Sequence, residues 1–286
     1  MTEFDTTGPL DVTLEVAVGD VRITAGDRPG TVVTVRPSDP GSDRDVRTAE
    51  QTRVECEDNR LRVRGPKQPG FGLFGKPGSI DVEISLATGS RVRSDMGIAA
   101  VRTTGTLGDS RFKTGVGNVH IQRAGALEVT TGSGDVEIEG ADGHTEASTG
   151  SGTLRLGVAH AGAVLKNSSG PVRVGSVTGE LRASSSNGDV LVGDAGAGVV
   201  ASTANGSIRL ESAGSGDVTL KTALGGLEVG IPEGTAAYLD LHTSFGTVRN
   251  TLDASPAPAP GEPSVQVRAR TAYGDIVVRR PARSFR

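Results

Sequence analysis

A glycine recurs about every eighteen residues through the middle of the chain, and the residues after it repeat with it. Successive glycines of this series are 17, 18, 18, 18 and 18 residues apart. Each opens a short run of alternating aliphatic residues, as in GDVEI, GTLRL and GPVRV. Such alternation is typical of a β-strand with one buried face, so every repeat predicts a strand that begins at a glycine turn. The glycines are Gly117, Gly134, Gly152, Gly170, Gly188 and Gly206.

A second run of alternating apolar residues completes each repeat, as in Leu181 and Ala183. Two such strands cannot bury their inner faces alone, whereas coils stacked about 4.8 Å apart form continuous apolar columns. Aromatic residues make up only 3% of the chain and tryptophan is absent, which suits a narrow core. We therefore expect an all-β fold, a β-solenoid with coils of about 18 residues and atypical capping coils at both ends.

One position at the corner of each predicted coil is polar rather than apolar. Stacked hydroxyl and amide side chains can hydrogen-bond along the axis of a solenoid, as asparagine and glutamine ladders do. The glycine at the same corner can adopt the positive φ that a tight turn requires, so it is interpreted as a turn element. The polar residues are Thr131, Thr149, Asn167, Ser185, Thr203 and Thr222.

Two segments rich in proline and glycine interrupt the repeats and predict protruding loops, at residues 64–79 and 254–264. We expect an amino-terminal β region with capping coils over residues 1–93 and the solenoid repeats over residues 94–286. The closing sequence RRPARSFR contains Pro281 among arginines. It is interpreted as a charged stop that opposes pairing of an end strand with another chain.

Charge and the chain termini limit the classes of partner. The formal net charge is −4 with both signs dispersed, so no nucleic-acid partner is expected. The opening MTEFDTTGPLDVTLEV has acidic residues where a signal peptide would have basic ones. No apolar run approaches the about 20 residues that a membrane-spanning helix needs. These features predict a cytoplasmic protein without a transmembrane segment, monomeric or weakly self-associating.

The repeats do not match a nucleotide or metal site. Neither a G-x-G-x-x-G fingerprint between a strand and a helix nor a phosphate loop ending in Lys-Ser or Lys-Thr is present. Aspartate follows the corner glycine at Asp135 and Asp189, but Thr153, Pro171 and Ser207 take its place in other coils. A calcium column needs an oxygen ligand from every coil. We expect no cofactor and no metal.

Carboxylates on neighbouring coils are the only candidates for catalysis. Polysaccharide lyases and hydrolases also use β-helices, and paired carboxylates can act as general acid and base. The glutamates of this chain alternate outward like solvated charges, and no long loop between Gly117 and Gly225 would wall a cleft. We therefore expect no enzyme. The glutamates concerned are Glu128, Glu137, Glu139 and Glu146.

One outward position in the first strand of each coil is repeatedly arginine. Stacked arginines would present a basic stripe to a phosphate or sulfate polymer. Glu137 and Leu191 interrupt the series, so an ordinary solvated sheet face is the competing interpretation. The arginines are Arg102, Arg155, Arg173 and Arg209.

A second candidate surface is the loop PGFGLFGKPG, which carries Phe71, Leu73 and Phe74 between prolines and glycines. An exposed apolar tip could dock a partner or dip into a membrane interface. It could equally fold over an open end of the solenoid as a cap, because uncovered sheet edges invite aggregation.

Several segments together resemble a known family. The openings NGDV and TGSGDVEI, the early LEVAVGDVRI and the late LDLHTSFGTVRN and RARTAYGDIVVRR resemble the bacterial putative-adhesin family of β-strand-repeat domains of unknown function. The resemblance covers most of the chain. It implies a right-handed, β-helix-like fold and no assigned enzymatic activity.

The sequence as a whole predicts a non-enzymatic structural or interaction protein that presents a flat sheet surface to a protein or polymer partner. A carbohydrate-active or anionic-polysaccharide-binding β-helix protein is the alternative. A bactofilin-like polymerising scaffold is a further alternative.

Overall fold

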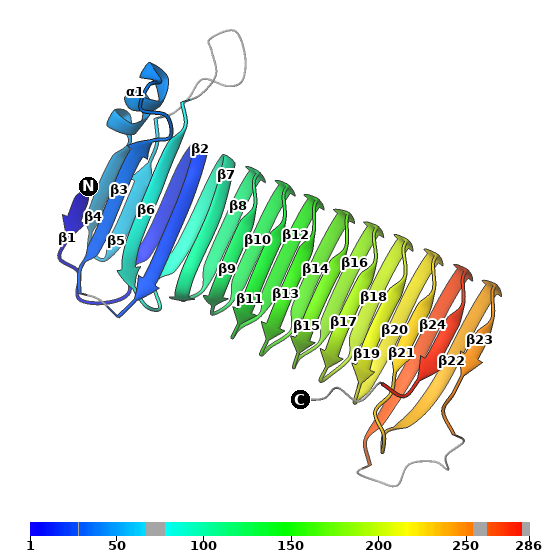
Figure 1. Ribbon diagram of the computed structural model, residues 1–286. Helices are drawn as coiled ribbons and strands as arrows, with labels where there is room; N and C mark the ends of the chain where they lie inside the picture. Colours follow the sequence, from blue (N-terminus) through cyan, green and yellow to red (C-terminus); the bar gives the residue numbers. More distant parts are fainter. Residues whose placement is uncertain (28, 67–77, 254–261, 282–286) are drawn as a thin grey trace. The chain divides into compact units, whose positions relative to one another are not determined.

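The computed structural model of the protein describes residues 1–27, 29–66, 78–253 and 262–281. Of the described residues, 69% lie in strands and 3% in a helix. The predicted all-β solenoid is confirmed. The chain forms two compact units, an amino-terminal unit of Met1–Gly143 and a carboxyl-terminal unit of His144–Arg286. Within each unit, strands of successive coils lie side by side (Figure 1). The predicted division into residues 1–93 and 94–286 stays a prediction.

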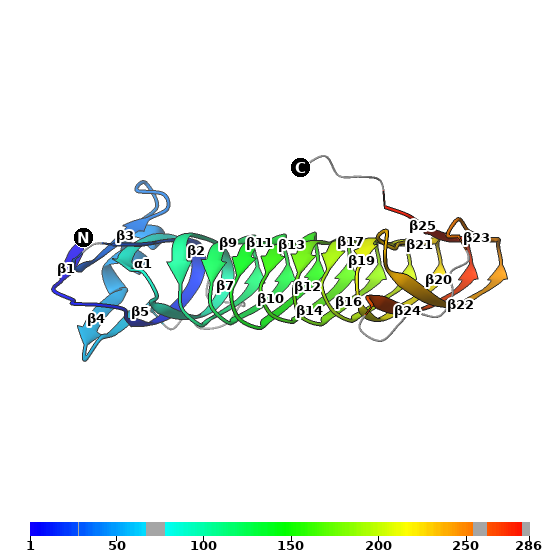
Figure 2. The same cartoon turned by 90° about the horizontal axis from the view of Figure 1, so that it is seen from below.

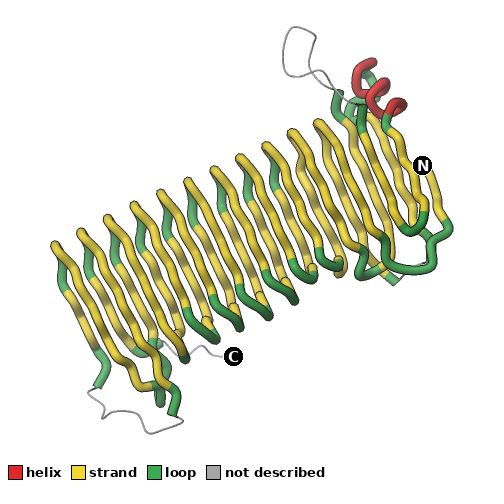
Figure 3. The backbone as a smooth tube through the Cα atoms, turned by 180° about the vertical axis from the view of Figure 1, so that it is seen from behind, coloured by secondary structure: helices red, strands yellow, loops and turns green. Residues whose placement is uncertain are grey.

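The amino-terminal unit begins with atypical, antiparallel strands. Strand β3 pairs antiparallel with β1 and with β6, and β4 forms an antiparallel hairpin with β5. Helix α1 packs against β3 and β6 and is drawn in red in Figure 3. The bounds are β1 (Thr2–Phe4), β2 (Asp11–Gly26), β3 (Thr31–Pro37), α1 (Asp43–Gln51), β4 (Arg53–Glu57), β5 (Arg60–Arg64), β6 (Ile80–Ala87), β7 (Arg91–Leu107), β8 (Ser110–Val116), β9 (Val119–Ala124), β10 (Leu127–Ser133) and β11 (Val136–Ala141).

Parallel coils follow in the same unit. The long strands β2 and β7 pair along most of their lengths, from Asp11 opposite Arg91 to Thr24 opposite Thr104. Strand β7 then pairs with both β8 and β9. In turn, β8 pairs with β10, and β9 pairs with β11. Corner glycine Gly19 lies in the middle of β2, so one continuous strand contributes to both sides of its coil.

In the carboxyl-terminal unit the coils are regular and parallel. Even-numbered strands β12 to β20 pair along one side of the coils and odd-numbered strands β13 to β21 along the other. Figure 2 shows the two series on opposite sides of the coils. The bounds are β12 (Thr145–Ser151), β13 (Leu154–Ala159), β14 (Ala163–Ser169), β15 (Val172–Val177), β16 (Leu181–Asn187), β17 (Val190–Ala195), β18 (Val199–Asn205), β19 (Ile208–Ala213), β20 (Gly216–Leu224), β21 (Leu227–Gly230), β22 (Ala236–Phe245), β23 (Val248–Asn250), β24 (Ser264–Tyr273) and β25 (Ile276–Arg279).

The predicted apolar columns form the core of this unit. Leu154 lies opposite Val172 in the neighbouring strand, Val172 opposite Val190, and Val190 opposite Ile208. All four side chains are fully buried. Because the pairing repeats after 18 residues, each aliphatic side chain lies over its counterpart in the next coil.

The corner glycines have the predicted role. Gly188 has a φ of 153°, and a Cβ atom built on it would lie 2.1 Å from the carbonyl oxygen of Gly170. Gly206 has the same geometry, because a Cβ atom built on it would lie 2.3 Å from the carbonyl oxygen of Gly188. A residue with a side chain would therefore suffer both backbone strain and a collision with the neighbouring coil.

The polar corner residues bond differently from the prediction. Thr203 donates its hydroxyl to the carbonyl oxygen of Gly188 at 3.0 Å, and Thr222 donates to that of Gly206 at 2.9 Å. The hydrogen bonds do connect neighbouring coils, but the acceptor is a main-chain carbonyl rather than another stacked side chain. A buried carbonyl at the corner requires a donor, which explains why this inward position is polar.

The aspartate after a corner glycine is also a structural residue. The carboxylate of Asp189 accepts the main-chain N–H of Ser207 at 2.8 Å, and that of Asp275 accepts the N–H of Thr247 at 2.8 Å. This hydrogen bond from Thr247 is the main reason why the pKa of Asp275 is lowered. Asp189 and Asp275 thus connect neighbouring coils.

The last coils do not stack in sequence order. Strand β24 pairs with β20 on one side and with β22 on the other, and β25 lies in the same way between β21 and β23. The final segment is therefore inserted beneath the coil that precedes it, and β22 with β23 forms the outermost coil (Figure 1).

This insertion corrects the interpretation of the closing arginines as a charged stop. Pro281 follows an interior strand, not an end strand. Arg279 forms ion pairs with Glu211 at 2.8 Å and with Glu228, and Arg280 donates to the carbonyl oxygen of Pro232 at 2.6 Å. The arginines fasten β25 to the coils beside it.

We expect Gly188→Ala to lower the free energy of unfolding by about 2 kcal/mol or more, because the new side chain is strained at positive φ and overlaps the carbonyl of Gly170. The measurement is urea denaturation followed by circular dichroism. Gly214→Ala is the matched control, since no atom lies within 4 Å of a Cβ there. Equal stability of the two variants would contradict the corner constraint.

We expect Arg279→Met to destabilise the protein by about 1–3 kcal/mol, because it removes two charge-assisted hydrogen bonds that hold β25. Arg270→Met is the control, since its ion pair with Asp240 at 3.4 Å is exposed and such pairs contribute about 0–1 kcal/mol. Hydrogen exchange of the β24 and β25 amides would report the loss locally. Similar protection in both variants would show that the Arg279 contacts do not fasten the inserted strands.

Candidate functional site

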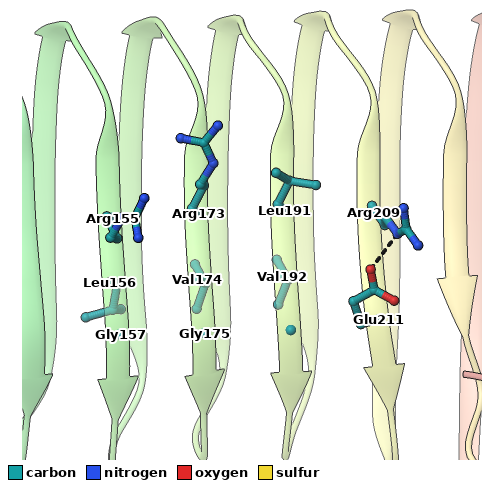
Figure 4. Close-up of a pocket in the computed structure, with 11 residues that line it drawn as sticks. Arg155, Leu156, Gly157, Arg173, Val174, Gly175, Leu191, Val192, Arg209 and Glu211 are labelled. Carbon is teal, nitrogen blue, oxygen red and sulfur yellow. Dashed lines mark ion pairs between the residues drawn. The ribbon is translucent and has the colours of Figure 1, made fainter. Parts of the chain in front are cut away.

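A shallow groove of about 310 Å³ lies on the outer face of the sheet formed by β13, β15, β17 and β19. Outward residues of four successive strands line it in two rows (Figure 4). The first row is Arg155, Arg173, Leu191 and Arg209, and the second is Gly157, Gly175, Gly193 and Glu211. Three of the four arginines predicted as a stripe therefore meet in one groove.

The repeat places the first row. Arg155 pairs with Arg173, Arg173 with Leu191, and Leu191 with Arg209 in the registers of the parallel strands. Neighbouring strands are about 4.8 Å apart, so the row follows the axis of the unit with that spacing. Each side chain points outward because it lies between two inward aliphatic residues.

The second row forms the floor. A Cβ atom on Gly175 would lie 2.5 Å from the carbonyl oxygen of Gly157, and one on Gly193 would lie 2.3 Å from that of Gly175. The strands approach so closely here that a side chain does not fit, which leaves the main chain as the bottom of the groove. Sequence reasoning missed this row, although its signal is visible as a second glycine five residues after Gly152, Gly170 and Gly188, in LRLG, VRVG and VLVG.

A charge network closes one end of the groove. Glu211 takes the place of glycine and pairs with Arg209 at 2.5 Å and with Arg279 at 2.8 Å. Glu228 contacts both arginines as well. Hydrogen bonding to Glu228 is the main cause of the raised pKa of Arg279, so this guanidinium stays charged. Arg209 is thus partly neutralised, as the dashed line in Figure 4 shows.

Arg173 lies in the middle of the row and differs from Arg209. Its side chain is exposed, and within the described residues no hydrogen bond or ion pair engages its guanidinium. Beside it, Leu191 is partly buried and contributes an apolar section of the wall. The groove therefore offers a guanidinium available for an anionic partner next to an apolar surface.

The fourth arginine of the predicted stripe, Arg102, lies in the amino-terminal unit on β7. Its neighbour in register on β9 is His120, which is followed by Glu137 on β11. The His120 ring contacts Glu137 at 3.2 Å through Nδ1 and Glu139 at 3.1 Å through Nε2. The corresponding row of this unit is thus of mixed charge.

The remaining candidates occupy separate places. Glu128 forms an ion pair with Arg111 at 3.2 Å, and Glu146 forms one with Lys166 at 3.3 Å. Cys56 lies on β4, where burial, rather than the neighbouring acidic residues, raises the pKa of its thiol. The predicted loop residues Phe71, Leu73 and Phe74 lie outside the described residues, as do most of the two predicted loops.

The described part of the chain holds neither a metal-binding cluster nor a membrane-spanning helix. No group of three or more His, Cys, Asp or Glu residues there could hold a metal ion. None of its helices has the length and apolar character needed to span a bilayer.

Several solved structures show similarity to this chain. A putative adhesin from Parabacteroides merdae ATCC 43184 is 12% identical over 78% of this chain and 92% of its own, with a TM-score of 0.48. A putative adhesin from Bacteroides fragilis NCTC 9343 is 13% identical over 97% of this chain and 96% of its own, with a TM-score of 0.33. A putative lipid binding protein from Parabacteroides distasonis ATCC 8503 is 11% identical over 98% of this chain and 96% of its own, with a TM-score of 0.31. No curated protein matches the sequence.

A family model covers nearly the whole chain. The model described as Toastrack DUF4097 matches residues 11–279, from the first long strand to the last. The resemblance to a bacterial putative-adhesin family of unknown function is thereby confirmed. The chain belongs to the Toastrack DUF4097 family.

Proposed function

We propose that the protein is a non-enzymatic interaction protein that binds an extended polymer carrying sulfate or phosphate groups along the groove over β13 to β19. The observation that carries the proposal is the row of Arg155 and Arg173 beside a floor of glycines. It supports the interpretation of these arginines as a basic stripe over that of an ordinary solvated face.

The chemistry of the row suits oxyanions. A guanidinium presents a rigid fork of N–H donors that can bind two oxygens of a sulfate or phosphate group. Arg173 has no competing partner within the described residues, so binding an anion there would break no ion pair. The exposed position also means that the attraction is screened by salt.

The shape of the groove suits a chain rather than a compact ligand. Its volume of about 310 Å³ is at the lower end of the range for small-molecule sites, and the space extends across four strands. The glycine floor lets a linear partner approach the main chain, while Leu191 can contact an apolar part of it. Successive coils repeat the same geometry, as a polymer repeats its units.

The same geometry favours binding over hydrolysis. Glycoside hydrolysis generally uses two carboxyl groups on either side of the scissile bond. Glu211 is the one carboxylate among the residues that line this groove, and it is held by Arg209 and Arg279. The lining of the groove therefore lacks the second carboxyl group that this chemistry requires.

We expect Arg173→Glu to weaken binding to heparin and to inorganic polyphosphate by about tenfold or more, because a charge-assisted hydrogen bond is lost and a repulsion is added. Biolayer interferometry at low and physiological salt would measure it, with neutral dextran as the negative polymer. Arg182→Glu makes the same charge change on the outer face of β16 and should keep the affinity.

Comparison of the two polymers would show whether sulfate or phosphate is preferred. Wild-type protein that binds neither polymer would overturn the proposal. An equal loss in Arg173→Glu and Arg182→Glu would also overturn it, because attraction would then depend on net charge and not on the groove.

We expect Leu191→Arg to strengthen binding to the same polymers about threefold or more, because it fills the gap in the row between Arg173 and Arg209. The measurement is again biolayer interferometry at low and physiological salt. Val200→Arg is the matched control, since Val200 is a partly exposed aliphatic residue at an outward position of β18. A gain that is no larger than the control's would argue against a continuous row.

A further inference from the structure

We propose that the outermost coil of the carboxyl-terminal unit, β22 with β23, is the interface of a two-fold symmetric dimer of this chain. The inference does not depend on the function of the groove. It rests on the open edges of these strands, on the apolar columns that end between them, and on the charges along β22.

The edges of the coil are open on one side. Strand β22 pairs with β24 and β23 pairs with β25, and within the described residues neither strand has a second partner. β22 is ten residues long. A row of unpaired N–H and C=O groups of this length is a template for another strand.

The core is also incomplete at this end. Leu239 and Leu241 continue the inner columns above Val267 and Ala269 and are only partly buried, whereas the residues beneath them are fully buried. Val248 is 46% exposed. The apolar columns therefore end in contact with solvent, and covering them would remove that surface from water.

The outer corner becomes aromatic in the same place. Phe245 stacks on Tyr273 with ring centroids 4.8 Å apart and an angle of 7° between the planes. Asn187 and Asn205 occupy the corresponding position in earlier coils. Phe245 is nevertheless 64% exposed, so further contacts remain available to it. A surface of this kind is typical of a protein interface.

A second copy of the chain is the occupant that meets all of these features at once. A single peptide strand could pair with β22 or with β23, but it would leave the columns between them uncovered. A second identical coil, related by a two-fold axis, presents two strands at the same separation and columns of the same width. The β22 strands of the two copies would then run antiparallel.

The charges on β22 suit this arrangement. When Leu241 lies opposite its own copy, Asp240 of each chain faces His242 of the other. Asp240 already contacts Arg270 at 3.4 Å within its own chain, so its carboxylate is held in place on the outer face. The pairing is self-complementary, as an isologous interface requires.

The described residues of the amino-terminal unit offer no matching surface for head-to-tail growth. There the outer strands β1 and β4 are joined to the sheet by antiparallel pairing, and α1 packs against β3 and β6. A parallel coil such as β22 with β23 does not find its counterpart in that arrangement. Association through the carboxyl-terminal coil therefore closes at two chains.

Sedimentation velocity of the full-length chain over a micromolar concentration series tests the dimer. We expect a reversible species of twice the chain mass of 29.1 kDa. A mass of one chain at every concentration would overturn the proposal. So would a mass that keeps rising with concentration, which would indicate a filament.

Two variants locate the interface. Leu241→Lys places a charge in the column at the edge, and His242→Asp puts two carboxylates opposite each other; each should weaken dimerisation at least about tenfold. Val200→Lys, on the outer face of β18, is the control that should stay dimeric. Circular dichroism shows whether each variant is folded. A dimer that survives both changes in the folded variants would place the contact elsewhere and overturn the inference.

Discussion

The structure depends on the close approach of one corner glycine to the carbonyl oxygen of the corner glycine in the next coil. At Gly206 the space for a Cβ atom is taken by the carbonyl of Gly188, and that carbonyl receives the hydroxyl of Thr203. Both relations connect neighbouring coils, so they fix the length of the coil and the register of the strands. The apolar columns are aligned as a consequence.

Much of this architecture follows from the sequence because it is periodic. The inward positions, the corner glycines and the polar corner residues could be predicted from spacing alone, since an element that recurs in every coil must occupy the same place in each. The order of the last coils could not be predicted in this way. The strands that begin at Gly225, Gly246 and Gly274 have similar sequences. Their similarity does not indicate which coil lies next to which.

The groove illustrates a different limit. Its arginine row was predicted, because an outward residue between two aliphatic residues is easily recognised. The glycine floor of the groove was not predicted. Gly157, Gly175 and Gly193 have no side chain, and the importance of this is visible only when the distance between the strands is known. Outward positions are free of the requirements that hold the coil together. They can therefore vary from coil to coil and carry the part of the molecule that meets a partner.

The insertion of β24 and β25 beneath β22 and β23 has a consequence for assembly of the chain. During synthesis the outer coil is made before the strands on which it rests, so it has no template until β24 and β25 have been added. The outermost coil of this unit can therefore take its place only after β25 has been made. A chain shortened by its final two strands would lose an interior layer and leave the outer one without support.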